Sequence, residues 1–278
     1  MGCCISTAVC FGSPEILPVS SEYGKRHKNF DTHLSKFFID DKNYLWKIHE
    51  EKTALELGYM LKNNRHIMNI PYHAHILKPK KCVHDTATTM AIQMPLAQID
   101  LFEIISYKFD WKYISEQLVG LASAIHFLHS CGAAHRDIKP ENIVKYDGRL
   151  HLIDFDYCYP LSSLAHCGTE FFKCPKSVTS TWDCSIQEKS KKMDVYSFGK
   201  LIVSILWQAS NRKMLNHNSY LFQTFRADYV KDHIHPLTGS HGRWLTIALI
   251  CISKTPPTEI PTYLAAESST SITVDVAT

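Results

Sequence analysis

The segment over residues 134–156, AHRDIKPENIVKYDGRLHLIDFD, constrains the fold and the chemistry more than any other part of the chain. Two apolar runs, NIVKY and RLHLID, flank Asp147-Gly148, which is a strong signal for a tight β-hairpin turn. Polar residues stand on both sides of this hairpin: Asp137, Lys139 and Asn142 before it, and Asp154 after it. Two carboxylates and an amide on short loops can hold Mg²⁺ and face a hydroxyl nucleophile.

The rest of the chain divides into a strand-rich part and a helical part. The expected elements are a hairpin (32–49), a helix (50–62), a buried strand (88–94), an amphipathic helix (111–128), a helix that is apolar almost all round (194–208) and a further helix (243–253). This order predicts an α+β fold, in which a small β-rich lobe precedes a larger helical lobe.

Composition and charge exclude several classes of protein. Hydrophobic residues make up 45% of the chain and charged residues 21%, which is typical of globular proteins. The net charge of +3 does not predict a nucleic-acid partner. The chain has no run of 18 apolar residues, so no membrane-spanning helix is predicted. The ten cysteines include no C-x-x-C pair, and the chain has no G-x-x-x-x-G-K-S/T loop, so neither a structural zinc site nor a P-loop NTPase is expected.

The run HRDIKPEN, followed by the hairpin and Asp154-Phe155-Asp156, resembles the catalytic and metal-binding loops of the eukaryotic-type protein kinase superfamily. This resemblance implies a two-lobed kinase fold and a role for each matching residue. Asp137 would be the catalytic base that orients the substrate hydroxyl. Lys139, at a position that favours serine/threonine kinases, would neutralise the transferred phosphoryl group. Asn142 and Asp154 would hold Mg²⁺ against the phosphates of ATP.

The resemblance extends over residues 24–264. Downstream, DVYSFG from Asp194 to Gly199 resembles the start of the buried helix that anchors the large lobe of kinases, and Gly168-Thr169 resembles their substrate-positioning loop. The stretch MPLAQIDLF and the divergent motifs are similar to kinases of large DNA viruses, including herpesviruses.

Upstream, HLSKFFIDDKNYLWKI resembles the second and third strands of the small kinase lobe, which makes Lys47 the candidate phosphate-binding lysine. Its helix partner would be Glu56, with Glu50 and Glu51 as alternatives. The interlobe hinge would lie in TTMAIQMPLAQIDLFEII, and the backbone groups that contact adenine would belong to Gln93, Met94 and Leu96.

Three parts of the family pattern are changed. No glycine lies between Gly24 and Gly58, so the glycine-rich phosphate loop is missing. Asp156 stands where the metal-binding loop usually has glycine. The A-P-E motif reads CPK and ends at Lys176, and the arginine that normally pairs with its glutamate is replaced by Ile260. Both ends of one buried ion pair are then lost together, which can be nearly neutral for stability.

These observations predict four segments: a flexible N-terminal arm (1–22), a kinase N-lobe (23–95), a kinase C-lobe (96–264) and a flexible tail (265–278). The leading hypothesis is a monomeric serine/threonine protein kinase that uses ATP and Mg²⁺ and acts on protein substrates. The alternative is a pseudokinase scaffold that binds partners with weak or no catalysis. The missing glycines favour the scaffold, whereas the retained base, lysine and metal ligands favour catalysis.

The first residues, MGCCIS, match M-G-x-x-x-S/T, the pattern for myristoylation of Gly2. A single myristoyl chain binds membranes only marginally, so stable anchoring takes a second signal. Palmitoylation of Cys3 and Cys4 would supply that signal directly beside the first lipid. We therefore expect a lipid-anchored kinase at the cytoplasmic face of a membrane.

Overall fold

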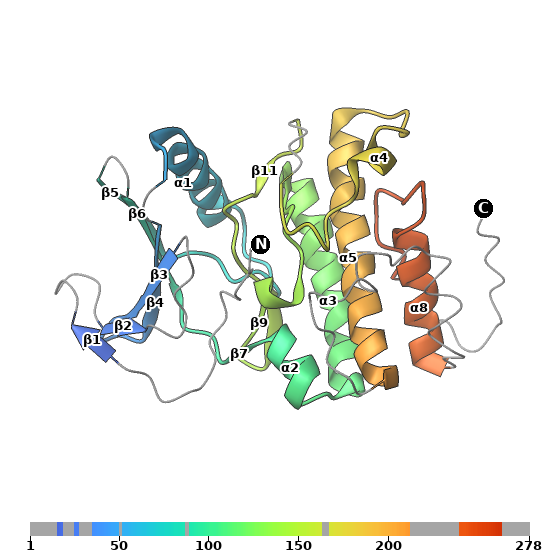
Figure 1. Cartoon of the computed structure of the whole chain (residues 1–278), viewed down its shortest axis with the longest axis horizontal. Coiled ribbons are helices and arrows are strands. Elements are labelled where there is room, and N and C mark those ends of the chain that lie inside the picture. Colours follow the sequence, from blue (N-terminus) through green and yellow to red (C-terminus); the bar gives the residue numbers. More distant parts are fainter. Residues whose placement is uncertain are drawn as a thin grey trace. The chain divides into compact units, whose positions relative to one another are not determined.

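The computed structural model describes residues 16–18, 25–27, 35–49, 52–86, 89–162, 167–211 and 239–262. These residues form an α+β protein with two compact units, Met1–Ile104 with Pro140–Cys158, and Ile105–Lys139 with Tyr159–Thr278 (Figure 1). The units differ from the linear lobes that we expected, because residues 96–104 and Pro140–Cys158 pack with the strand-rich unit.

The first unit contains a six-stranded antiparallel sheet with the order β1-β2-β3-β4-β6-β5. Its strands are β1 (Ile16–Pro18), β2 (Lys25–His27), β3 (Ser35–Ile39), β4 (Tyr44–His49), β5 (Lys81–Thr86) and β6 (Thr89–Pro95). The hairpin of β3 and β4 was predicted, and its register places Phe37 opposite Lys47. Strand β1 differs from the irregular arm expected over residues 1–22, because its backbone pairs with β2.

Alternation along the strands builds the core of this unit on both faces of the sheet. Phe37 packs in a cluster with Leu45, Leu57 and Met90, whereas its neighbour Phe38 packs in a second cluster with Trp46, Ile48 and Ala91. Helix α1 (Ala54–Asn69) supplies Leu57 to the first cluster and so covers that part of the sheet.

Helix α1 begins and ends later than the helix expected over residues 50–62. Thr53 is its N-cap, and it forms a capping box with Glu56: the Thr53 hydroxyl accepts from the Glu56 N–H at 3.2 Å, and the Thr53 N–H donates to the Glu56 carboxylate at 2.9 Å. Such a reciprocal pair fixes the first turn of a helix.

The predicted hairpin around Asp147-Gly148 is formed by β9 (Ile143–Tyr146) and β10 (Arg149–Leu152). Asp147 and Gly148 have φ values of 48° and 77°, the left-handed conformation that a two-residue hairpin turn requires. Strand β7 (Ile99–Asp100) completes a three-stranded sheet beside β9. The short η2 helix (Pro140–Asn142) leads directly into β9.

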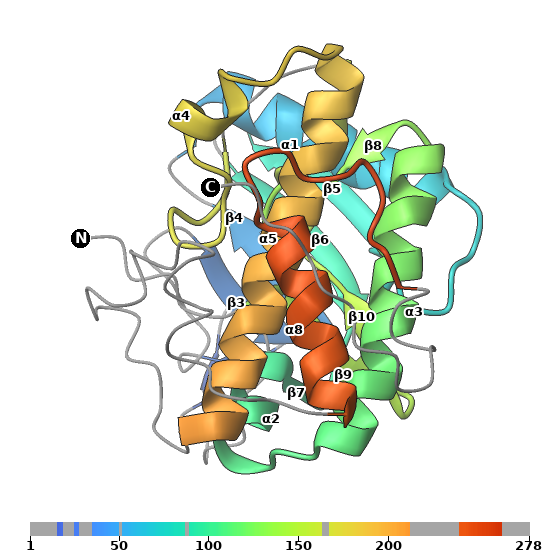
Figure 2. The ribbon, with the colours of Figure 1, turned by 90° about the vertical axis from the view of Figure 1, so that its right-hand side faces the viewer.

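The second unit is mainly helical (Figure 2). Its elements are the end of α2 (Leu101–Tyr107) from Ile105 onward, α3 (Trp111–Ser130), α4 (Lys176–Thr179), α5 (Ile186–Asn211), α8 (Gly239–Cys251) and a two-stranded sheet of β8 (Ala133–Ala134) and β11 (Tyr159–Pro160). The apolar stripe predicted for α3 is confirmed, because Ile114, Leu118 and Ile125 are buried. Lys176 is exposed and Ile260 half-buried, so the changed A-P-E position leaves no buried charge at either residue.

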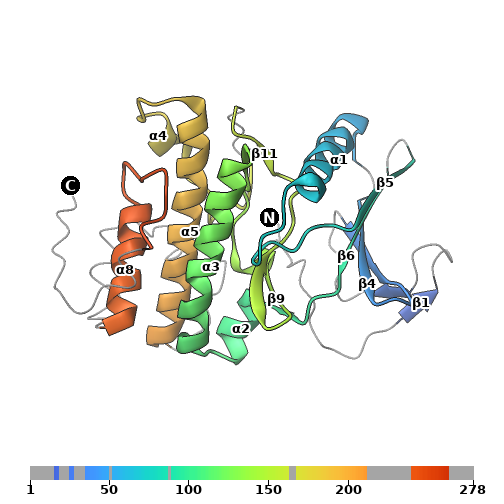
Figure 3. The ribbon, with the colours of Figure 1, turned by 180° about the vertical axis from the view of Figure 1, so that it is seen from behind.

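Helix α5 is the central helix of this unit, and it lies beside both α3 and α8 (Figure 3). Every residue from Asp194 to Leu206 is buried, as the apolar sequence predicts. At Gly199 the backbone of α5 closely approaches the end of α8, and a Cβ on Gly199 would lie 2.6 Å from the Cβ of Cys251. Among the described residues, no helix is both long enough and apolar enough to cross a membrane.

Candidate active site

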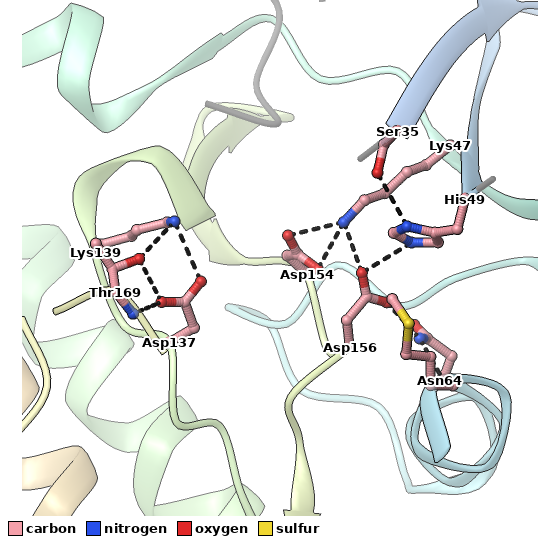
Figure 4. Close-up of polar contacts among 10 residues, drawn as sticks. Ser35, Lys47, His49, Asn64, Asp137, Lys139, Asp154, Asp156 and Thr169 are labelled. Carbon is pink, nitrogen blue, oxygen red and sulfur yellow. Dashed lines mark hydrogen bonds and ion pairs between the residues drawn. The ribbon is translucent and has the colours of Figure 1, made fainter. Parts of the chain in front are cut away.

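In the helical unit, two side chains, those of Lys139 and Thr169, contact the carboxylate of Asp137, which is 6% exposed (Figure 4). The N–H and the hydroxyl of Thr169 both donate to Oδ1 of Asp137 at 2.8 Å. The ammonium of Lys139 lies 3.2 Å from Oδ2 and donates to the Thr169 hydroxyl at 2.8 Å. Burial alone would raise the pKa of Asp137, but Lys139 and Thr169 hold it below its usual value. The carboxylate therefore stays ionised at neutral pH.

Gly168 lets the segment that carries Thr169 closely approach the loop that carries Arg136 and Asp137. It has a φ of 96°, and a Cβ at this position would lie 2.1 Å from the carbonyl oxygen of Arg136. Only glycine fits this conformation and this space. The Gly168-Thr169 pair singled out in the sequence therefore lies against Asp137, as a substrate-positioning loop would.

The backbone before Asp137 is held by Asp194, the first residue of the DVYSFG motif. One carboxylate oxygen accepts from the His135 N–H and the other from the Arg136 N–H, both at 2.8 Å. The imidazole Nε2 of His129 lies 2.9 Å from the same carboxylate. Burial alone would raise the pKa of Asp194, but these partners hold it below its usual value. This anchoring role is one that the sequence motif alone did not reveal.

In the strand-rich unit, the candidate metal ligands lie at one end of the β9–β10 hairpin. Asn142 immediately precedes β9, and its carbonyl accepts from the Ile153 N–H at 3.0 Å. Asp154 follows on the next residue, with a φ of 63°. The antiparallel pairing therefore brings an amide and a carboxylate that are twelve positions apart in the sequence to the same end of the hairpin.

Lys47 reaches from β4 to two carboxylates of the loop after β10 (Figure 4). Its Nζ donates to both carboxylate oxygens of Asp154 at 3.0 Å and to Oδ2 of Asp156 at 2.7 Å. Burial alone would lower the pKa of Lys47, but the two carboxylates raise it. The lysine is therefore charged and bound directly to a predicted metal ligand.

The two carboxylates differ in their surroundings. Burial and the neighbouring charge of Asp156 raise the pKa of Asp154, although Lys47 opposes this. Burial alone would also raise the pKa of Asp156, but Lys47 and His49 hold it well below its usual value. Asp156 is therefore the more firmly ionised member of the pair.

The expected pairing of Lys47 with Glu56 is wrong in this structure. Glu56 lies in the first turn of α1 and is exposed, and its carboxylate accepts from the N–H and the hydroxyl of Thr53. A capping box needs the glutamate in the first turn of the helix, about two turns before Asn63 and Asn64, the α1 residues that bond to Asp156. The alternatives Glu50 and Glu51 lie outside the described residues.

Sequence reasoning missed the residues that surround Asp156. Asn64 of α1 donates to Oδ1 of Asp156 at 2.9 Å, and Asn63 donates to its backbone carbonyl at 2.9 Å. The Nε2 of His49 lies 3.0 Å from Oδ2. One signal was present: His49 is two positions after Lys47 on a strand, so both side chains point to the same face. The asparagines were missed because the helix was expected to end at residue 62.

The predicted adenine-contacting residues lie on β6 and just after it. The backbone carbonyl of Gln93 accepts from the Lys80 N–H at 2.7 Å, and its side chain donates to Asp40 at 2.9 Å. Met94 and Leu96 pack with the apolar cluster around Phe37. The two hydrogen bonds hold Gln93 in place within the sheet. The assignment of the three residues to adenine contacts stays a prediction.

A small pocket borders Lys47 and the loop after β10 within the strand-rich unit. It combines a polar side with an apolar wall, and its lining residues are Lys47, Asn64, Leu77, Pro79, Ile92, Met94, Ile153, Asp154, Phe155 and Asp156. The lipidation candidates Gly2, Cys3 and Cys4 lie outside the described residues.

Comparison with known proteins identifies the family. The chain matches the protein kinase domain over residues 40–238. It is 28% identical over 184 residues to an Acanthamoeba polyphaga mimivirus protein provisionally named a serine/threonine-protein kinase, a match that covers 60% of this chain and 63% of that protein. The maternal embryonic leucine zipper kinase of Danio rerio is 31% identical over 206 residues, covering 67% of this chain and 30% of that kinase.

The serine/threonine-protein kinase DCLK1 of Rattus norvegicus is 29% identical over 177 residues, covering 59% of this chain and 39% of that kinase. Each of these matches spans less than two thirds of the relative's own length. The family match, by contrast, covers most of this chain and includes Lys47, Asp137 and Asp154. The chain therefore belongs to the protein kinase family.

Proposed function

We propose that the chain is a serine/threonine protein kinase that transfers the γ-phosphate of ATP to hydroxyl groups of protein substrates. The observation that carries this proposal is the group of Asp137, Lys139 and Thr169. An ionised carboxylate, a lysine and a hydroxyl lie within 3.2 Å of one another. Catalysis of phosphoryl transfer consists almost entirely of positioning and charge stabilisation, which these groups can provide.

The residues of the helical unit would act on the substrate hydroxyl. Asp137 would accept its hydrogen bond and orient it for attack, and Thr169 would keep the carboxylate in one orientation through its two bonds. Lys139 would place a positive charge beside the developing phosphoryl group. Its bond to the Thr169 hydroxyl restricts the ammonium to this position.

The residues of the strand-rich unit would bind the phosphate side. Carboxylate and amide oxygens are ligands that suit Mg²⁺, so Asn142 and Asp154 would hold the ion. The Asp154 side chain is 15% exposed, which leaves part of it accessible. When bound, Mg²⁺ neutralises negative charge on the phosphates. Lys47 would contribute a second positive charge by contacting phosphate oxygens.

Incubation of the purified chain with labelled ATP, Mg²⁺ and casein or histone tests this proposal. We expect phosphoserine and phosphothreonine in the acceptor. Asp137→Asn should lower the rate by about 10²–10⁴-fold, because it removes the acceptor of the hydroxyl proton. Asp147→Asn makes the same chemical change at an exposed turn and should leave the rate unchanged. Equal labelling by wild type and Asp137→Asn would refute the proposal.

A pseudokinase scaffold is the second candidate function. The absence of glycine between Gly24 and Gly58 favours it, since glycine lets a backbone approach phosphates closely. The same assay separates the two functions. A scaffold would give no transfer above the Asp137→Asn level, even at ATP concentrations that saturate binding.

We further propose that the kinase acts as a monomer on the cytoplasmic face of a membrane, held by myristate on Gly2 and palmitate on Cys3 and Cys4. The M-G-x-x-x-S/T pattern supports the first lipid, and the adjacent cysteines support the second signal that stable anchoring requires. The basic residues Lys25, Arg26 and Lys28 would add weak attraction to anionic headgroups.

Mass spectrometry of the cellular protein first establishes whether Gly2 is its N-terminal residue and carries myristate. In cell fractionation, wild type should sediment with membranes, Gly2→Ala should be soluble, and the double variant Cys3→Ser/Cys4→Ser should be released by a salt wash. A Gly2→Ala variant that still sediments with membranes would show that the anchor lies elsewhere.

A further inference from the structure

Asp156 is the most fully bound carboxylate of the strand-rich site. Its Oδ2 accepts a hydrogen bond from Nζ of Lys47 at 2.7 Å and lies 3.0 Å from Nε2 of His49. Its Oδ1 accepts from the side-chain amide of Asn64 at 2.9 Å. Its backbone carbonyl accepts from Asn63 at 2.9 Å. All four partners are buried, with 2–5% of their surface exposed. A buried carboxylate persists only when its charge and its oxygens are satisfied in this way.

The chemistry of α1 explains why a carboxylate is needed here. In protein kinases the phosphate-binding lysine pairs with a glutamate of the helix that follows it. The residues that α1 presents to this site are amides, Asn63 and Asn64, which cannot balance a buried ammonium. The single acidic residue of α1 is Glu56, which is exposed and caps the helix. The charge opposite Lys47 comes instead from the position where the metal-binding loop usually has glycine.

The two aspartates near Lys47 are also not equivalent. The contact of Asp156 with Lys47 is the shorter one, and its side chain is 5% exposed, against 15% for Asp154. Every oxygen of Asp156 already has a protein partner. Asp156 is thereby unsuited to be a further metal ligand, whereas Asp154 retains an accessible part that could take one.

We propose that Asp156 is the positioning residue that holds Lys47 for phosphate binding, and that it replaces the helix glutamate in this role. The inference rests on the proposed function, because Lys47 needs positioning only if the site binds nucleotide. Asp156 connects three elements: β4 through Lys47 and His49, α1 through its two asparagines, and the metal-binding loop on which it stands. Helix α1 is thus linked to Lys47 by neutral hydrogen bonds to a shared carboxylate.

His49 extends this arrangement along the sheet. Its Nδ1 lies 3.0 Å from the Ser35 hydroxyl on the neighbouring strand, and its Nε2 lies at ion-pair distance, 3.0 Å, from Oδ2 of Asp156 (Figure 4). The contact with Ser35 holds the imidazole beside Oδ2 of Asp156, and Asn64 fixes the Oδ1 side by donating a hydrogen bond to it. The carboxylate therefore has one orientation, and Lys47 has one place to bind.

The test compares nucleotide binding and kinetics of the whole chain with Asp156→Asn, which keeps the shape and removes the charge. We expect affinity for ATP–Mg²⁺ to fall by about 10- to 100-fold, the value of a hydrogen bond to a charged group. This weaker binding should appear mainly as a higher KM for ATP, and KM for the protein acceptor should not change. Asp147→Asn is the matched control at an exposed turn.

A double variant moves the carboxylate back to the helix. Asp156→Gly/Asn64→Glu places the acidic group on α1 and glycine in the metal-binding loop, and it should restore ATP affinity to within about tenfold of wild type. A merely structural role for Asp156 would not be rescued in this way. If Asp156→Asn does not fold, Asn64→Ala tests the positioning role instead, because it keeps the charges of Lys47 and Asp156 and removes one hydrogen bond to the carboxylate. We expect this variant to lose about 2- to 10-fold in ATP affinity.

The outcomes separate this inference from the proposed function. If wild type binds ATP and transfers phosphate, and the variants bind ATP as well as wild type does, the inference is overturned and the kinase activity stands. If wild type binds ATP without transfer, and Asp156→Asn weakens binding, the inference holds and the kinase activity falls. A wild-type chain that binds no ATP overturns both.

Discussion

The carboxylate of Asp194 shapes the backbone that carries Asp137. Arg136, the residue before Asp137, has a φ of 67°. This left-handed conformation costs an ordinary L-residue about 1–2 kcal/mol. The hydrogen bonds from the N–H groups of His135 and Arg136 to Asp194 offset that cost, because bonds to a buried charged group are stronger than neutral ones.

Asp194→Asn should therefore destabilise the helical unit and displace the loop that carries Asp137. The amide can accept at one atom only, so one buried N–H loses its partner. We expect the free energy of unfolding to fall by about 2–4 kcal/mol in urea titrations. Asp183→Asn, at an exposed position, should change it by less than about 0.5 kcal/mol. Equal stability of the two variants would contradict the anchoring role.

The residues of the site differ in how far the sequence could predict them. Asp137, Lys139, Asn142 and Asp154 lie in one short segment, and local spacing around a hairpin turn was enough to find them. The partners of Lys47 lie 107 and 109 residues further along the chain, so only the fold brings them together. A glutamate near Lys47 in the sequence was the wrong choice, since local distance says little about side chains on a sheet and a helix.

Helix α5 shows which part of an element hydrophobicity can predict. The apolar run from residue 194 is its buried part, but the helix already starts at Ile186 with polar and exposed residues. Its start carries a different signal, the Ser185–Glu188 pair. The Ser185 N–H donates to the Glu188 carboxylate at 3.0 Å, and the Glu188 N–H donates to the Ser185 hydroxyl at 3.2 Å. The Thr53–Glu56 pair marks the start of α1 in the same way.

Lys200 is a charged residue within the buried part of α5, and its burial predicts a pH-dependent stability. It is 6% exposed, its ammonium lies 5.4 Å from the ring centroid of Phe171, and burial lowers its pKa to about 8. Below pH 8 the lysine is charged in both the folded and the unfolded chain, so folding bears the full cost of burying it. Between the folded pKa and the ordinary value of 10.5, the unfolded chain binds more protons, so stability rises with pH.

Lys200→Met should thus stabilise the protein at pH 7 by about 1–3 kcal/mol, as it removes the buried charge and keeps a long apolar side chain. Its advantage over wild type should shrink as the pH rises from 8 towards 10. Urea unfolding at pH 7 and at pH 9.5 measures the difference. Lys176→Met, at an exposed lysine, should show no such dependence. An advantage for Lys200→Met that is constant with pH would mean that titration of this lysine is not the cause.

Across the whole chain, the sequence predicted the elements that have local signals and missed the contacts that depend on distant pairing. The β9–β10 hairpin, the stripe of α3 and the buried part of α5 follow from turn residues and apolar periodicity. The grouping of Pro140–Cys158 with the strand-rich unit could not be predicted in this way. Its backbone bonds join Leu152 to His75 and Leu77, and those depend on the tertiary fold.

Asp154, the predicted metal ligand, shares its pairing with Lys47 with a second carboxylate. Lys47 has a second carboxylate in Asp156, so removing the charge of Asp154 leaves no unpaired buried ammonium. Asp154→Asn should therefore fold with wild-type stability in the absence of ligand. It should lose phosphoryl transfer, because an amide is a much poorer ligand for Mg²⁺ than a carboxylate.

Thermal unfolding with and without ligand separates these two effects. A ligand present at 100 times its Kd stabilises the folded state by about 2.7 kcal/mol, which should appear as a clear rise in the Tm of wild type with ATP and Mg²⁺. Chelation of the metal with EDTA should remove most of that rise. In Asp154→Asn the Tm with ATP should be the same with Mg²⁺ and with EDTA, since the ion has lost its charged ligand. A rise in Tm that still depends on Mg²⁺ in this variant would place the metal on other residues.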